Sequence, residues 1–168
     1  MLRVERAEII HIEGISKVCS DGYRETYKET HTQEYIERII NEYYNHDRLS
    51  EEIKFEGDGW DGWFVALDGA EVVGAIGGGM IEKEKSEVFV LYLNPQRRRE
   101  GIGTLLLEAL TKVQKDKGAI EQWVSVSKGN QKGIPFYEAR NFKYVNEQIS
   151  HANIDGEEYK SYRYVRKI

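Results

Sequence analysis

The sequence predicts an α/β (α+β) domain with a central mixed, mostly antiparallel sheet of about six to seven strands and about four helices. Three observations support this prediction. The apolar run at residues 88–93 ends at Asn94-Pro95, and from Gly101 onward apolar residues recur at helical spacing, as in a strand followed by an amphipathic helix. Asp68-Gly69 between two apolar runs is typical of an antiparallel hairpin. Residues 121–126 then alternate as a strand that runs parallel to its predecessor, because a helix connects the two.

The composition indicates one soluble domain over residues 1–168, with 40% hydrophobic and 32% charged residues. Twenty-four Lys and Arg against 29 Asp and Glu give a net charge of −5, which argues against nucleic-acid binding and suits a cationic small substrate. The N-terminus lacks the apolar stretch of a signal peptide, and no apolar run approaches the roughly 20 residues that span a bilayer. We therefore expect a cytoplasmic protein without membrane contact. Cys19 is the sole cysteine, so we expect a structural thiol and no internal disulfide.

The N-terminal third predicts one short strand and three helices. Residues 2–5 suit the strand, and the apolar residues between Ile9 and Cys19 suit a helix that Gly14 weakens without excluding. Thr32 offers an N-cap for a second helix, and a third runs over residues 47–54. This segment is rich in tyrosines, for which packing between helix and sheet is the plain interpretation: Tyr23, Tyr27, Tyr35, Tyr43 and Tyr44.

The remaining elements follow the same signals. Residues 63–67 and 71–80 flank the Asp68-Gly69 turn as two strands, and glycines 74, 77, 78 and 79 in the second allow bends, bulges or the close approach of a ligand. Residues 82–85 form a charged turn before the strand at 88–93. A short helix with Pro135 in its first turn and a hairpin turned by Asp155-Gly156 close the chain, at residues 131–140, 141–150 and 158–165.

A phosphate-binding segment is predicted at residues 96–104, between the central strand and its helix. It holds three arginines and two glycines where the helix begins, and a helix N-terminus offers unpaired N–H groups and the positive end of the helix dipole. Leu106 stands where a dinucleotide fingerprint needs a third glycine, and the Gly-Lys-Ser/Thr of a P-loop is absent. The alternative is an ordinary basic loop at a strand–helix turn.

Two blocks of residues resemble the GNAT superfamily of acetyl-CoA-dependent N-acetyltransferases. The spacing Arg98-x-x-Gly101-x-Gly103 after a strand resembles the family's R/Q-x-x-G-x-G/A pyrophosphate motif. The block from Asn130 to Phe142, with Phe136-Tyr137 in register, is similar to its N-x-x-A-x-x-F-Y-x-x-x-G-F pattern. This block departs from the pattern at Gly133 and Asn141, and asparagine is the next-best residue after glycine for a left-handed helix end.

The resemblance implies a single GNAT domain over residues 1–168, with a splayed parallel pair in its sheet, acetyl-CoA as cosubstrate and no metal. It implies that Leu91, Tyr92 and Leu93 hold the pantetheine arm, and that a main-chain N–H near Leu91 or Tyr92 polarises the thioester carbonyl. Asn130 would contact the cofactor arm. The pyrophosphate would lie on Arg98, Arg99, Gly101, Ile102, Gly103 and Thr104.

The same resemblance assigns two catalytic side chains. Tyr137 matches the family's general acid, which returns a proton to the departing thiolate; the alternative is a core tyrosine beside Phe136. Glu87 lies at the spacing where some members keep a catalytic base, although a glutamate at a strand start is often merely solvated. Glu71, His151 and water molecules are rivals for the base.

We therefore expect an N-acetyltransferase that moves the acetyl group of acetyl-CoA to a primary amine of a small cationic substrate. Residues 23–29, 33–36 and 47–52 are similar to a bacterial GNAT branch that acetylates spermidine and spermine, and a polyamine would suit the acidic balance. The alternatives are a protein or peptide N-acetyltransferase, which requires an open groove between the first helices and the closing hairpin, and a non-catalytic acetyl-CoA sensor. A monomer and a homodimer both fit the sequence.

Overall fold

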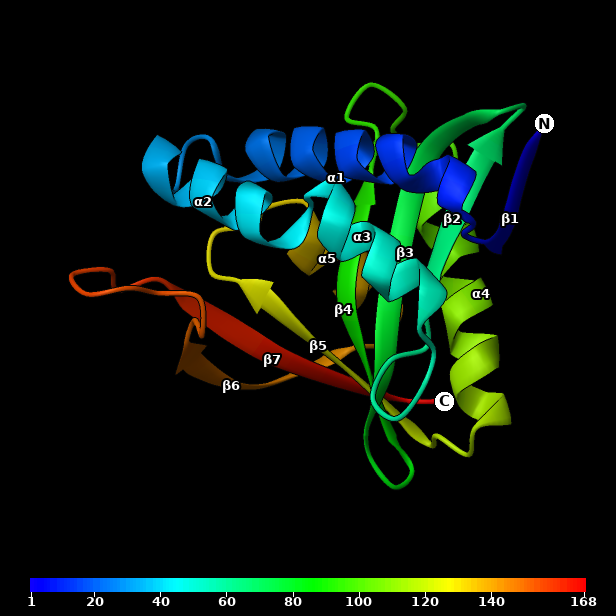
Figure 1. Cartoon of the computed structure of the whole chain (residues 1–168). Helices are drawn as coiled ribbons and strands as arrows, with labels where there is room; N and C mark the ends of the chain where they lie inside the picture. Colours follow the sequence, from blue (N-terminus) through cyan, green and yellow to red (C-terminus); the bar gives the residue numbers. More distant parts are fainter.

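The computed structural model describes all 168 residues, and its centre is a seven-stranded sheet of order β1-β2-β3-β4-β5-β7-β6 (Figure 1). Every neighbouring pair is antiparallel except β4 and β5, which confirms the predicted mixed sheet. The strands are β1 (Leu2–Arg6), β2 (Trp63–Asp68), β3 (Glu71–Glu82), β4 (Lys85–Leu93), β5 (Glu121–Ser127), β6 (Lys143–Ile149) and β7 (Lys160–Lys167). The helices are α1 (Ile12–Tyr27), α2 (Gln33–Tyr43), α3 (His46–Lys54), α4 (Ile102–Asp116) and α5 (Gly133–Glu138), with a 3₁₀ turn at Ile9–His11.

The parallel pairing of β4 and β5 is short, so the two strands separate toward the end of β4. β4 and β5 pair only from Lys85 with Glu121 to Val88 with Val124. Beyond that point β4 continues beside β3 to Leu93, whereas β5 continues beside β7 to Ser127. The two strands therefore diverge, and the last residues of β4 have no strand on their β5 side.

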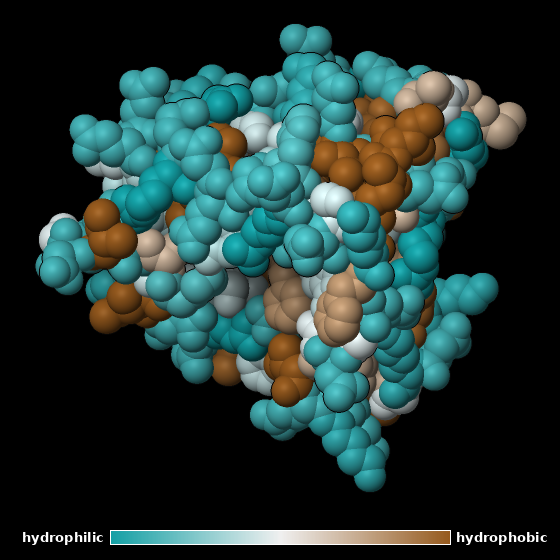
Figure 2. Space-filling model, viewed as in Figure 1, coloured by the Kyte–Doolittle hydropathy of each residue, from teal (hydrophilic) through white to brown (hydrophobic).

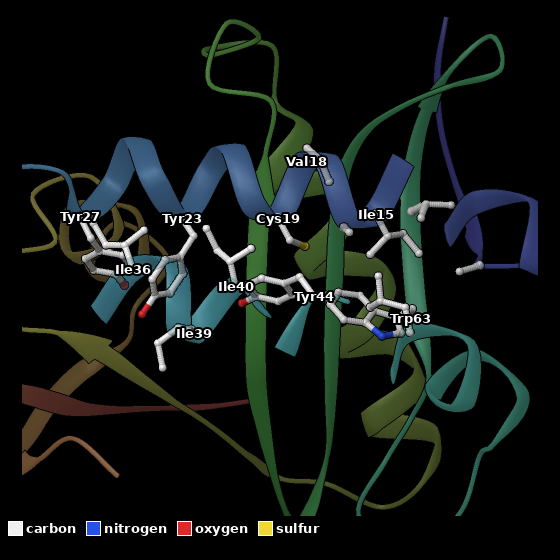
Figure 3. Close-up of a cluster of buried hydrophobic side chains, with 14 of the residues drawn as sticks. Ile15, Val18, Cys19, Tyr23, Tyr27, Ile36, Ile39, Ile40, Tyr44 and Trp63 are labelled. Atoms are coloured by element: carbon white, nitrogen blue, oxygen red, sulfur yellow. The ribbon is translucent and has the colours of Figure 1, made fainter. Parts of the chain in front are cut away.

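Helices cover both faces of the sheet and bury two separate cores. One core lies between the sheet and α1–α3, and it includes Ile15, Cys19, Tyr23 and Tyr27 from one side of α1, as Figure 3 shows. The other lies beneath α4 and α5 on the opposite face, around Leu106, Leu110 and Phe142. Because α4 follows β4 directly, its N-terminus lies at the end of β4 where the strands diverge.

Local signals explain where the elements begin and end. Thr32 Oγ1 accepts a hydrogen bond from Tyr35 N–H at 3.1 Å, which confirms the predicted cap of α2. Asn141 has a φ of 69°, the left-handed conformation expected of the residue that replaces the family glycine. Several predicted bounds were wrong. The first helix extends to Tyr27, and the turn predicted at residues 82–85 is narrower, because β3 runs to Glu82 and β4 begins at Lys85. The elements predicted at residues 131–140, 141–150 and 158–165 cover Gly133–Glu138, Lys143–Ile149 and Lys160–Lys167.

The glycines of β3 make room for another part of the chain. A Cβ at Gly79 would lie 2.0 Å from Gly59 O, and one at Gly77 would lie 2.6 Å from the Trp60 ring. Asp61 N–H also donates to Gly78 O at 2.8 Å, so the loop at residues 57–62 lies directly on β3. The close approach that the sequence suggested for a ligand is made by this loop, which brings Trp60 onto the sheet.

Cys19 is completely buried in the core beneath α1, and burial raises the pKa of its thiol. On the surface, hydrophilic side chains cover most of the face in Figure 2, apart from hydrophobic patches such as the one at the upper right over the start of α1. None of the helices combines the length and the apolar character that crossing a membrane requires.

Candidate active site

A cavity of about 1130 Å³ runs along β4 between the sheet and α1–α3. Its wall also includes the loop after β5, the start of α5, and the segment between β6 and β7. Seven of the predicted site residues line it: Glu87, Leu91, Tyr92, Leu93, Arg98, Asn130 and Tyr137. Segments far apart in the sequence therefore converge on one cavity, which we divide into a donor end near α4 and α5 and an acceptor end near α2 and α3.

The peptide groups of β4 give the donor end its hydrogen-bond donors. Asn94 N–H donates to Val73 O of β3 at 2.9 Å. Because peptide groups alternate along a strand, Tyr92 N–H also points toward β3, whereas Leu91 and Leu93 N–H point to the side that β5 has left. The sequence left open whether Leu91 or Tyr92 donates its main-chain N–H to the thioester carbonyl. The geometry favours Leu91, because its N–H is not directed toward β3. A β-bulge also leaves Phe89 without a partner on β3, and its side chain lines the cavity.

The start of α4 has the features of an anion site. Its N-cap is Gly101 with a φ of 79°, no side chain caps the helix, and its first turn carries no acidic residue. The first N–H groups of the helix therefore lack partners within it. Arg99 also adopts a positive φ of 64°, a conformation that costs a non-glycine residue energy and is often found at functional sites.

Five predicted phosphate-binding residues lie beside the cavity rather than in its wall: Arg99, Gly101, Ile102, Gly103 and Thr104. The side chain of Ile102 is buried in the core, so only its main chain can bind a ligand. Gly103 has a packing role that the sequence did not reveal, since a Cβ there would lie 3.0 Å from the Phe136 ring. Thr104 Oγ1 accepts a hydrogen bond from Arg140. Arg97 holds the loop in place by ion pairs to Asp68 at 2.9 Å and Glu100 at 2.7 Å.

Asn130 lines the donor end and also supports α5. Its Oδ1 accepts a hydrogen bond from Gly133 N–H at 2.8 Å, at the start of the helix that carries Tyr137. A Cβ at position 133 would lie 2.5 Å from Asn130 Nδ2, so the two residues are in close contact. Asn130 therefore fixes the direction from which α5 presents Tyr137.

Tyr137 is buried, but its hydroxyl is free for a ligand. The ring lies edge-on to Phe136 and Phe142, with centroids 5.2 Å apart in each case. The hydroxyl makes no hydrogen bond within the protein, although the side chain lines the cavity. Burial, and to a smaller extent Tyr27, raises the pKa of Tyr137, so the phenol keeps its proton at neutral pH. This is the arrangement expected of a proton donor.

Glu87 lies where β4 and β5 begin to diverge, and it has a cationic partner that the sequence did not predict. Arg163 Nη1 of β7 lies 2.9 Å from Glu87 Oε2 and 2.9 Å from Ser125 Oγ of β5. Only 15% of the Glu87 side chain and 17% of the Arg163 side chain are exposed, so the pair is largely shielded from solvent. Three strands are thus tied together at the point of divergence.

The two other side chains considered as bases differ in position. Glu71 lies outside the cavity, 64% exposed and 3.6 Å from Arg97, so its geometry gives it no part in the site. His151 lines the cavity between β6 and β7 and is exposed to solvent. Glu87, His151 and water therefore remain as candidates.

The acceptor end is formed mainly by aromatic side chains. Tyr23 lies 4.5 Å from Tyr27, 5.9 Å from Tyr92 and 6.3 Å from Tyr44 between ring centroids. Figure 3 shows Tyr23 and Tyr27 projecting from α1 beside Ile36 and Ile39. Burial raises the pKa of the Tyr23, Tyr44 and Tyr92 phenols, so they stay neutral. These tyrosines are core residues, and their rings also line the cavity. Core packing and a place in the acceptor wall therefore both apply to them.

Carboxylates and tryptophans complete the acceptor end, and sequence reasoning missed them. Glu52 accepts hydrogen bonds from Trp63 Nε1 at 3.0 Å through its carboxylate and from Trp60 Nε1 at 2.9 Å through its main-chain oxygen. Its other carboxylate oxygen lies 3.2 Å from Arg48 Nε. Glu51 lines the same end of the cavity. The glycines of β3 were the one sequence signal for this region, because they leave space for the Trp60 ring against the sheet.

The segment between β6 and β7, residues 150–159, closes one side of the cavity and is called the strap below. Ser150, His151 and Ala152 of the strap line the cavity wall. The strap contacts α2 and the loop before it, because Arg38 pairs with Glu157 at 2.7 Å and His31 stacks on Tyr159 with centroids 4.0 Å apart. The open groove that a peptide substrate would need between helices and hairpin is thus bridged.

Known proteins resemble the chain in both sequence and fold. A family profile described as "Acetyltransferase (GNAT) family" matches residues 21–142. The spermidine N(1)-acetyltransferase of Thermoplasma acidophilum is 33% identical over 144 residues, which cover 84% of this chain and 88% of that protein. The crystal structure of the PaiA N-acetyltransferase from Thermoplasma acidophilum in complex with coenzyme A superposes with a TM-score of 0.82 at 26% identity, covering 100% of this chain and 99% of that one.

A more distant structure shares the fold alone. Ard1 from Thermoplasma volcanium superposes with a TM-score of 0.70 at 16% identity, covering 99% of this chain and 97% of that one. The family profile, by contrast, spans well over half of the chain and includes α4 and α5, where many of the predicted donor-site residues lie. The chain therefore belongs to the GNAT family and is an N-acetyltransferase.

Proposed function

We propose that the chain transfers the acetyl group of acetyl-CoA to a primary amine of a small cationic substrate, with a polyamine as the first candidate. The observation that carries this proposal is the single cavity with two chemically different ends. Main-chain donors, a helix N-terminus and the basic residues Arg98 and Lys132 suit an anionic thioester cosubstrate. Aromatic rings with the carboxylates of Glu51, Glu52 and Glu87 suit an alkylammonium group.

The donor end has room and partners for coenzyme A. The diverging part of β4 offers Leu91 and Leu93 N–H to the pantetheine amides, and the first turn of α4 offers its N–H groups to the pyrophosphate. The bound thioester supplies the acetyl group. Leu91 N–H polarises its carbonyl, and Tyr137 donates the hydroxyl proton to the departing sulfur, which leaves as the thiol of coenzyme A.

The amine must lose a proton before it attacks, because an amine with a pKa near 10 is almost wholly ammonium at pH 7. We assign Glu87 as the base, directly or through a water molecule, since its carboxylate lies in the cavity wall on the same strand as Leu91. Its pairing with Arg163 holds the carboxylate in one direction. The neutral, desolvating wall of tyrosines also favours the uncharged amine.

Two observations favour a small acceptor over a peptide. The strap bridges the side through which a polypeptide would enter, and Trp60 and Trp63 line the cavity at its acceptor end. The spermidine-acetylating relative also supports a polyamine. A peptide acetyltransferase remains the second candidate function, because Ser150, His151 and Ala152 border the cavity at the position where a groove would open.

A thiol-release assay with acetyl-CoA tests the proposal. Spermidine, spermine, a monoamine and a short peptide with a free N-terminus are compared at equal concentration. We expect turnover with the polyamines well above the peptide. Turnover with the peptide alone would replace the proposed acceptor, and no turnover with any amine, while coenzyme A still raises the melting temperature, would indicate a sensor.

A further inference from the structure

The strap is held by one ion pair that reaches it from α2. Arg38 Nη1 and Nη2 donate to the two carboxylate oxygens of Glu157 at 3.0 and 2.7 Å, and Nη2 also lies 3.2 Å from Ala152 O. Glu157 in turn accepts a hydrogen bond from Ile154 N–H at 2.9 Å. The side chains are only 28% and 17% exposed, so this pair is more shielded than an ordinary surface salt bridge.

A second contact lies beside the first and depends on packing. The His31 ring stacks on Tyr159 with centroids 4.0 Å apart, and Tyr159 also lies 4.6 Å from Tyr35. Thr32 N–H donates to the Tyr159 hydroxyl at 3.0 Å. The strap therefore packs against the N-terminal end of α2 through aromatic rings and is aligned there by Arg38.

The pair acts on the cavity wall without touching the reacting groups. Arg38 and Glu157 do not line the cavity, but Arg38 binds the main chain of Ala152, which does. The neighbouring wall residues Ser150 and His151 precede Ala152 directly in the chain. Loss of the pair would therefore loosen this wall while leaving Tyr137, Leu91 and the start of α4 in place.

We propose that the Arg38–Glu157 pair sets the size limit of the acceptor site, by holding the strap closed over the acceptor end. The inference rests on the proposed transfer to a small amine and makes Arg38 and Glu157 positioning residues for specificity. A wall fixed by a bidentate pair admits a thin alkylamine and excludes a polypeptide, whereas a released wall admits both.

Hydrogen exchange tests whether the pair holds the strap. In Glu157→Gln the amides of residues 150–159 are expected to exchange faster, while those of α4 are unchanged. The matched control is Glu37→Gln, because Glu37 is the sequence neighbour of Arg38 and forms a similar bidentate pair with Arg24 at 2.9 Å, with no strap contact. The charge-reversed pair Arg38→Glu with Glu157→Arg should restore only part of the slow exchange, because it remakes the ion pair but not the hydrogen bonds to Ala152 O and from Ile154 N–H. Unchanged exchange in Glu157→Gln would overturn the inference whatever the acceptor is.

Steady-state kinetics test whether the closed strap limits the acceptor. In Glu157→Gln we expect KM for spermidine to rise about tenfold, as loss of a charge-assisted pair suggests, with KM for acetyl-CoA unchanged. The ratio of kcat/KM for spermidine over a peptide N-terminus should fall by at least the same factor, and Glu37→Gln should match the wild type. An unchanged ratio with a loosened strap would overturn the size limit. If the wild type acetylates no amine, the proposed function fails, and the size limit with it, although the exchange result on the strap stands.

Discussion

The donor end and the acceptor end of the cavity are built by different means. We assign the donor end to main-chain groups of residues 91–93 in the cavity wall and of residues 101–104 beside it, with α5 next to them. The acceptor end is formed by side chains from α1, α2, α3, the Trp60 loop and the strap. A ligand held by main-chain groups is still bound when the side chains change, provided that the glycines and the turn before α4 keep the backbone in place. Recognition by assembled side chains changes whenever one contributing segment changes, so we expect the donor to be common to relatives and the acceptor to vary.

The largest effect is expected at Tyr137, the proposed proton donor on α5. Tyr137→Phe removes one hydroxyl that has no partner in the protein, so stability should hardly change. General acid catalysis contributes about 10²–10⁴-fold, so kcat should fall by that order with KM for acetyl-CoA nearly constant. Steady-state kinetics and thermal unfolding of the same variant give both quantities. An undiminished kcat would reject the acid assignment.

A loss of about 10²-fold in turnover at pH 7 is expected for Glu87→Gln if Glu87 is the base. The loss should shrink at high pH, where more of the amine is already free. Arg163→Lys keeps the positive charge beside Glu87 and serves as the comparison, with a smaller effect and the wild-type pH profile. A loss that stays constant with pH would make Glu87 a positioning group instead.

An effect of about tenfold on coenzyme A affinity should distinguish two substitutions at Gly101. Asn and Asp both tolerate a positive φ and both cap helices, so Gly101→Asn and Gly101→Asp differ mainly in charge. Either side chain can cap the free helix, but only the carboxylate should repel the pyrophosphate. Isothermal titration with coenzyme A measures the difference. Equal affinities would mean that the phosphate does not lie at this helix start.

A smaller and more selective effect is expected from two alanines on β3. A Cβ at Gly77 meets Trp60 at 2.6 Å, and a Cβ at Gly74 meets Leu106 beneath α4 at 2.9 Å. Overpacking should cost each variant about 1–3 kcal/mol of unfolding free energy. Only Gly77→Ala should also raise KM for the amine, by several-fold, because it displaces the acceptor wall. The same KM change in both variants would contradict the assignment of Trp60 to the acceptor end.

The smallest effect concerns the pH dependence of stability near the strap. Burial lowers the pKa of His31 below 6.5, against an opposing effect of Glu157, and the ring faces Tyr27, Tyr35 and Tyr159. The unfolded chain therefore binds the proton more tightly, so the contribution of His31 to stability is complete above pH 6.5 and declines as the pH falls below it. Denaturant unfolding should show that the free energy of unfolding of the wild type falls relative to that of His31→Phe as the pH drops below 6.5. A pH-independent difference would contradict the prediction.

The difference between the two ends also explains which features could be predicted from the sequence. The order of strands and helices, the hairpin at Asp68-Gly69 and the proposed donor residues depend on local spacing, and a local pattern can be recognised in a single chain. The Glu87–Arg163 pair joins residues 76 positions apart (163 − 87), and the Arg38–Glu157 pair joins residues 119 positions apart. No local pattern encodes such pairs. The glycines at 77–79 were noticed as a site of close approach, but the approaching group became known only from the loop that lies on them.

The burial of Cys19 has a practical consequence for these experiments. The folded protein exposes no reactive sulfur, because its sole thiol is enclosed by the core beneath α1 and its pKa is raised. A colorimetric reagent for thiols would therefore report released coenzyme A without a background from the enzyme. A single cysteine introduced at Ile154, which is 56% exposed on the strap, would be the one site for a fluorescent or spin label. Motion of the strap could then be followed in the otherwise natural chain.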